Sequence, residues 1–188
     1  GKGTFFLITQ VVSIGVISLG MGFAPSILFF LKQKKLTKNE AITISVFYSL
    51  FVALILFLIF LFFKKSIIEL FNNTISENIL LFTLILILID LLINFWSFIL
   101  MSNETGVKSW SIISILGGIM YLICLSLLLF NFYDVGVILA VYALLIGFST
   151  KALLLLRYVF MNKVYFNIVS IKTVKSMGKY AFGILIGN

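Results

Sequence analysis

The sequence has 188 residues, of which 62% are hydrophobic and only 11% are charged. Soluble domains contain roughly 25% charged residues, and a chain of this length cannot bury so much apolar surface in one globule. This composition therefore excludes a soluble protein and a disordered one. We interpret the net charge of +8 as basic loops on the cytoplasmic side of a membrane rather than as a nucleic-acid-binding surface.

Five apolar segments are long enough to cross a hydrocarbon core of about 30 Å at 1.5 Å per residue. The strict alternation of apolar and polar residues that a barrel strand requires is missing from them, so we expect helices. The sequence thus predicts an all-α polytopic transmembrane bundle. Its full spans are 4–31, 41–63, 79–101, 110–130 and 136–156, and the start of a sixth lies at Tyr180.

The first predicted span is irregular in its second half. Pro25 lacks a backbone N–H and clashes with the preceding turn, so we expect a kink there. Upstream of the proline, Gln10 and Ser13 share one face of the helix. We take these two polar side chains as candidate substrate-binding residues.

Asp90 lies near the middle of the third predicted span. A carboxylate there costs about 2.5–3.5 kcal/mol to insert, so such residues usually face a bundle interior or a wet cavity. Thr83, Asp90, Asn94 and Ser97 form one polar stripe at helical spacing. The stripe either lines a substrate or ion path, with Asp90 and Asn94 in contact with the cargo, or holds the bundle together by interhelical hydrogen bonds.

Lys151 is the basic residue inside the fifth predicted span. Its ammonium could snorkel to the inner interface. Alternatively, the small residues that precede it at helical spacing favour close packing and an inward position, where Lys151 could pair with Asp90 or meet an anionic substrate. The sequence leaves both positions open. The small residues are Gly136, Ala140, Ala143 and Gly147.

The loops after the first, third and fifth spans carry ten Lys and Arg residues, against three on the opposite side. By the positive-inside rule, Gly1 lies outside and the segment 157–179 is cytoplasmic. Within that segment the spacing of lysines and aliphatic residues predicts a basic amphipathic helix on the anionic inner leaflet, at about 164–179.

The sequence contains no recognisable catalytic motif. One cysteine and no histidine leave no zinc site and no histidine-based triad to propose. No loop carries a glycine-rich phosphate cradle or paired carboxylates with supporting groups. We therefore expect a protein that is not an enzyme and that uses no metal or cofactor.

Both ends of the chain resemble known sequence patterns. The opening "GKGTFFLITQVVSIGVISLGMGFAPSILFFLKQKKLTKNEA" resembles the second helix of bacterial Wzx-type O-antigen flippases, which belong to the multidrug/oligosaccharidyl-lipid/polysaccharide exporter superfamily. A Gly-x-Gly-aromatic entry at 1–5, a Leu-Gly-x-Gly stretch at 19–22 and a basic loop carry the likeness. The ending "VKSMGKYAFGILIGN" resembles the opening of the seventh helix.

The resemblance implies a MATE-like half-transporter and a fragment of a longer protein. Residues 1–179 would be a partial N-terminal six-helix lobe without its first helix, and residues 180–188 would begin the second lobe. The implied function is flipping of an undecaprenyl-pyrophosphate-linked oligosaccharide across the bacterial inner membrane, for O-antigen or capsule synthesis. Other membrane proteins of glycan assembly are its expected partners. The alternatives are a cation-coupled multidrug exporter of the same superfamily, a membrane polymerase or acyltransferase, and a purely structural membrane subunit.

Overall fold

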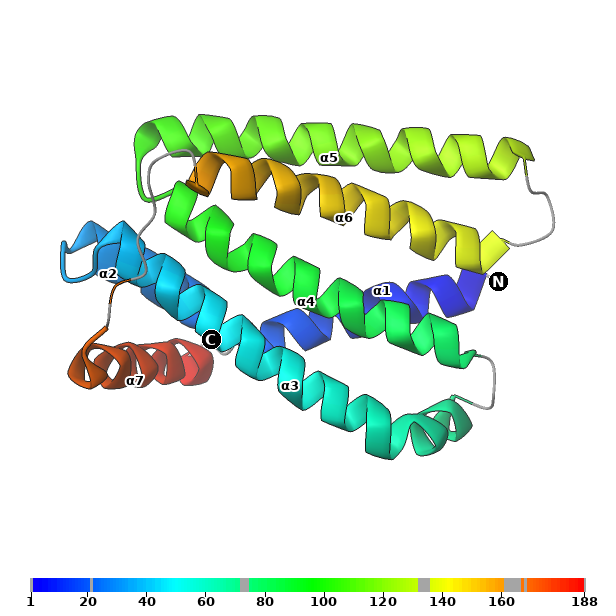
Figure 1. Ribbon diagram of the computed structural model, residues 1–188, viewed down its shortest axis with the longest axis horizontal. Coiled ribbons are helices and arrows are strands. Elements are labelled where there is room, and N and C mark those ends of the chain that lie inside the picture. Colours follow the sequence, from blue (N-terminus) through cyan, green and yellow to red (C-terminus); the bar gives the residue numbers. More distant parts are fainter. Residues whose placement is uncertain are drawn as a thin grey trace.

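The computed structural model describes residues 2–20, 22–71, 75–131, 136–160, 167 and 169–187. Over these residues the protein forms seven α-helices and no strand (Figure 1). Five of them, α1, α3, α4, α5 and α6, are long and apolar enough to cross a membrane. The prediction of an all-α polytopic bundle is confirmed. The helices are α1 (Lys2–Gly20), α2 (Phe23–Lys32), α3 (Lys38–Leu70), α4 (Glu77–Leu100), α5 (Glu104–Asn131), α6 (Gly136–Phe160) and α7 (Ile171–Gly187).

Helix α4 is the centre of the bundle. It packs against α1, α2, α3, α5 and α6, and half of its most apolar stretch is buried, against less than a quarter in each of the other spanning helices. Helices α4, α6 and α5 lie side by side in this order, so that α6 separates α4 from most of α5 (Figure 1). Because helices surround α4 on several sides, polar residues on more than one of these sides face a neighbouring helix.

Helix α3 is longer than its predicted span. It begins in a capping box, in which the Thr37 hydroxyl accepts a hydrogen bond from the Glu40 N–H while the Glu40 carboxylate accepts one from the Thr37 N–H. It then continues for 33 residues, about 50 Å at 1.5 Å per residue. Beyond the predicted end of the span, Lys64 forms an ion pair with Glu77 at the start of α4.

The prediction of a kink at Pro25 is wrong, because the first span breaks earlier. Helix α1 ends at Gly20, and α2 begins at Phe23 after Gly22, which has a left-handed φ of 69°. Pro25 is then the third residue of α2. The first four N–H groups of a helix have no intrahelical partner, so proline loses no hydrogen bond there.

The break is stabilised by side chains from α3 and α7. The last carbonyls of α1 lack the N–H groups of a continuing helix, and the Tyr48 hydroxyl of α3 donates to the Leu19 carbonyl oxygen at 2.7 Å. Gly22 lies close to α7, since a Cβ added to it would be 2.7 Å from the Ala181 carbonyl oxygen. The position thus requires glycine both for its φ and for this approach.

Helix α7 combines two segments that the sequence analysis predicts as separate elements. The basic segment and the start of the sixth apolar run form one helix, and it packs on α2: the Ser26 hydroxyl donates to the Met177 carbonyl oxygen, and Tyr180 stacks on Phe29 with ring centroids 4.2 Å apart. The first part of the predicted amphipathic helix, 164–166 and 168, lies outside the described residues. The division into lobes at 179/180, which falls inside α7, remains a prediction.

Substitution of the glycine at the break should destabilise the protein. In Gly22→Ala the new side chain disfavours the left-handed backbone conformation, and its Cβ collides with the Ala181 carbonyl oxygen. We therefore expect a loss of about 2 kcal/mol in the free energy of unfolding. Gly20→Ala is the matched control, because its Cβ meets only a Leu91 methyl at 3.7 Å. Thermal unfolding in detergent measures both, and equal stability of the two variants would contradict this account of the break.

Candidate functional site

Asp90 lies in the middle third of α4 on the side that faces α6, and its side chain is half-buried. The charge that acts on its carboxylate is the Lys151 ammonium of α6. Within the described part of the chain, Lys64–Glu77 is the one ion pair closer than 4.0 Å. Asp90 and Lys151 therefore attract each other without forming an ion pair.

Two glycines let the Lys151 side chain lie between helices. A Cβ added to Gly117 of α5 would be 2.2 Å from the Lys151 Cγ, so the stem of the lysine occupies the space that this glycine leaves. One turn earlier in α6, a Cβ on Gly147 would be 2.8 Å from the Tyr121 Cβ. Close approach of α5 and α6 at these glycines fixes the path of the lysine stem.

The ammonium of Lys151 points toward the interior of the span. Its Nζ lies 5.5 Å from the centroid of the Phe148 ring, one turn toward the N-terminus of α6 and away from the helix end that carries Arg157. A snorkelling lysine would extend toward that end. The stem thus lies against Gly117 of α5, and the ammonium lies near Phe148 rather than near Arg157.

The polar stripe on α4 divides into two kinds of residue. Thr83 and Ser97 are buried, and their hydroxyls donate to carbonyl oxygens of their own helix, at Ile79 (2.7 Å) and Asn94 (2.8 Å). These two side chains need no further partner. In contrast, the Asp90 carboxylate and the Asn94 side-chain amide, both half-buried, receive no hydrogen bond from the described residues. Asp90 and Asn94 are therefore the members of the stripe able to bind a ligand.

Gln10 and Ser13 lie apart from this pair. Both are exposed on α1, on the face opposite the one that packs into the bundle through Ile8 and Val12. The Ser13 hydroxyl donates to the Thr9 carbonyl oxygen at 3.0 Å. The described part of the chain thus brings together Asp90 and Lys151, with Asn94 one turn away, and leaves Gln10 and Ser13 on an outer surface. Their role in binding remains a prediction.

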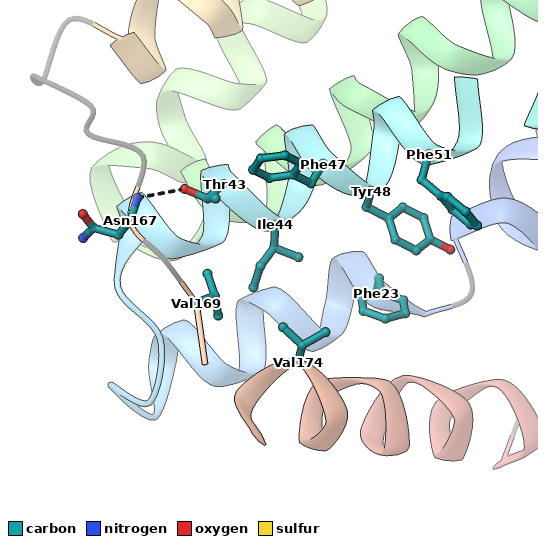
Figure 2. Close-up of a pocket in the computed structure, with 9 residues that line it drawn as sticks. All are labelled: Phe23, Thr43, Ile44, Phe47, Tyr48, Phe51, Asn167, Val169 and Val174. Carbon is teal, nitrogen blue, oxygen red and sulfur yellow. Dashed lines mark hydrogen bonds between the residues drawn. The ribbon is translucent and has the colours of Figure 1, made fainter. Parts of the chain in front are cut away.

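A pocket of about 600 Å³ lies between α3 and the beginning of α7, with α2 as its floor (Figure 2). Its polar atoms are few: Thr43 accepts a hydrogen bond from the Asn167 N–H at 3.2 Å, and Tyr48 reaches the break. Sequence reasoning missed this pocket because its walls come from segments far apart in the chain. The lining residues are Phe23, Thr43, Ile44, Phe47, Tyr48, Phe51, Asn167, Val169 and Val174.

The pocket adjoins the break between α1 and α2. Tyr48, which donates to the Leu19 carbonyl, also packs its ring on Phe23 at a centroid distance of 4.8 Å, and both rings line the pocket. The pocket and the break therefore share the Tyr48 side chain.

The described residues contain no cluster of three or more Asp, Glu, His or Cys side chains able to hold a metal ion. Comparison with family models, with curated proteins and with solved structures returned no match to this chain.

The two opposite charges should be energetically coupled. Lys151→Met or Asp90→Asn leaves one partner unpaired within the span, whereas the double variant removes both charges. We expect the double variant to be more stable than the sum of the single losses implies, by about 1–2 kcal/mol. Chemical unfolding in detergent measures this coupling, with Lys64→Met as a control on an exposed ion pair. Strictly additive losses would show that Asp90 and Lys151 do not interact.

Proposed function

We propose that this chain is part of a transporter that flips a lipid-linked oligosaccharide across the bacterial inner membrane. The observation that carries the proposal is the placement of Asp90 and Lys151, two opposite charges held apart in the middle of membrane-spanning helices. Charges at this depth are expensive, and they usually mark the path of a polar cargo or an ion.

The physical task of such a transporter is to replace the hydrogen bonds that sugar hydroxyls lose when they leave water. The Asp90 carboxylate accepts hydrogen bonds from hydroxyls, and the Asn94 amide both donates and accepts them. Lys151 supplies the cation that a pyrophosphate group requires. Gln10 and Ser13 would contribute further polar contacts from the exposed face of α1.

The lipid part of the cargo needs an apolar surface instead. The pocket beside the break is lined mainly by aromatic and aliphatic side chains, so it suits an isoprenoid chain better than a sugar. A broken helix next to it agrees with the use of discontinuous helices near transport sites. In this proposal α1 and α2 correspond to the second helix of the MATE-like fold, and α7 opens its second lobe.

Replacement of Lys151 tests the charged part of the proposal. Lys151→Gln should lose most export of the glycan, because the pyrophosphate then lacks its cation, while Lys151→Arg should keep part of it. Surface polysaccharide is measured in cells that depend on this protein, with the amount of inserted protein measured in parallel. Full export by the Gln variant at a normal protein level would remove Lys151 from the binding site. Equal loss of export and of protein would assign it a structural role.

The orientation, with Gly1 outside and 157–179 cytoplasmic, is tested separately by cysteine labelling. In a Cys124→Ser background, Lys35→Cys should resist an impermeant thiol reagent in intact cells, and Lys65→Cys should react. Both positions are exposed; Lys35 precedes the start of α3, and Lys65 lies in its last two turns. Labelling of Lys35→Cys but not of Lys65→Cys would reverse the proposed topology.

A further inference from the structure

A second apolar groove lies on the outer surface of the bundle, between the first turns of α5 and the last turns of α6. Its volume is about 270 Å³. The two helices run in opposite directions, so the start of α5 and the end of α6 border the same side of the membrane (Figure 1). This groove shares no residue with the pocket beside the break or with the Asp90–Lys151 pair.

The lining of the groove changes from polar to apolar along its length. Ser109, Arg157 and Tyr158 lie nearest the helix ends. One to two turns deeper, the walls are Ile112 and Leu116 of α5 and Leu154 of α6. A groove that is cationic at one end and apolar along the rest of its length matches an amphiphile with an anionic headgroup and an apolar chain.

Arg157 is available to a ligand at the polar end. It is exposed, and none of the described residues accepts a hydrogen bond from its guanidinium or forms an ion pair with it. The planar guanidinium can bind a phosphate through two parallel hydrogen bonds, which a lysine ammonium does not match. Lys108, one residue before Ser109, is also exposed and adds positive charge at this end.

The larger pocket beside the break has no charged residue in its lining, whereas the groove between α5 and α6 has Arg157. The apolar walls of the groove, Ile112 and Leu116, are exposed on a helix long and apolar enough to span a membrane, where lipid chains would contact them. The charge and the depth of the groove together select a lipid as its occupant.

We infer that the groove between α5 and α6 binds one anionic phospholipid, with an acyl chain along Ile112, Leu116 and Leu154 and the phosphate on Arg157. The lipid comes from the leaflet that borders this end of the bundle. It is distinct from the transported cargo, and its binding does not depend on the proposed function. Bound there, it fills the surface hollow between two helices whose contact positions Lys151.

Native mass spectrometry of the purified protein in detergent tests this inference, with phosphatidylglycerol and phosphatidylcholine as probes. We expect one retained phosphatidylglycerol, and weaker retention of phosphatidylcholine, whose net charge is zero. Arg157→Gln should weaken phosphatidylglycerol binding about tenfold, because hydrogen bonds between charged groups are lost. The affinity of Arg157→Lys for phosphatidylglycerol should lie between that of the unchanged protein and that of Arg157→Gln. Lys35→Gln is the matched control, since it removes one exposed positive charge from another loop and should leave the retained lipid unchanged.

A second variant tests the apolar part of the groove. Ile112→Trp places a large side chain where the acyl chain lies, and it should reduce retention of both lipids about equally; helicity and a monodisperse elution profile confirm that each variant is folded. Equal binding of the two lipids, an equal effect of Lys35→Gln, or unchanged binding by Ile112→Trp would each overturn the inference. A preference for a polyprenyl phosphate over phosphatidylglycerol would also overturn it, because the groove would then be a cargo site.

Discussion

Inside a bilayer, polar groups have to find partners within the chain, because hydrocarbon offers none. The break between α1 and α2 shows how this constraint is met. The Leu19 carbonyl, which a continuing helix would have satisfied, accepts the Tyr48 hydroxyl of α3 instead. The same ring packs on Phe23 and on Phe95 of α4, with centroid distances of 4.8 and 5.5 Å. One tyrosine thus joins the break to the central helix.

The same constraint explains the polar residues of α4. Thr83 and Ser97 donate to carbonyl oxygens of their own helix and can be buried at little cost. A carboxylate has no donor to offer when ionised, so Asp90 depends on a cation from another helix. The Lys151 ammonium attracts this carboxylate without an ion pair, and Gly117 and Gly147 bring α5 and α6 close enough to enclose the lysine stem. Glycines in α5 and α6 therefore control the position of the Lys151 side chain.

The bundle has two apolar hollows besides the Asp90 and Lys151 side chains, and the two hollows differ in the charge of their lining residues. The pocket between α3 and α7 adjoins the break and is lined by no charged side chain, whereas the groove between α5 and α6 ends at Arg157. A transporter of a lipid-linked cargo needs both a polar path and surfaces for lipid. In the proposal, the first hollow takes the lipid part of the cargo, while the second lies on helices that hold Lys151 in place.

Composition and periodicity alone determined the membrane location, the helical class and the approximate positions of the spanning helices, because hydrocarbon imposes length and backbone pairing on any chain that crosses it. The residues of one helix that share a face, such as Asp90 and Asn94, also followed from spacing. Relations between helices did not. The sequence left Lys151 between snorkelling and inward positions, and it predicted a kink at Pro25, whereas the break lies at Gly22. Each outcome depended on contacts from distant segments: Gly117 for the lysine, and Tyr48 and Ala181 for the break. The apolar pocket likewise exists only because α2, α3 and α7 meet, and no local pattern encodes that meeting.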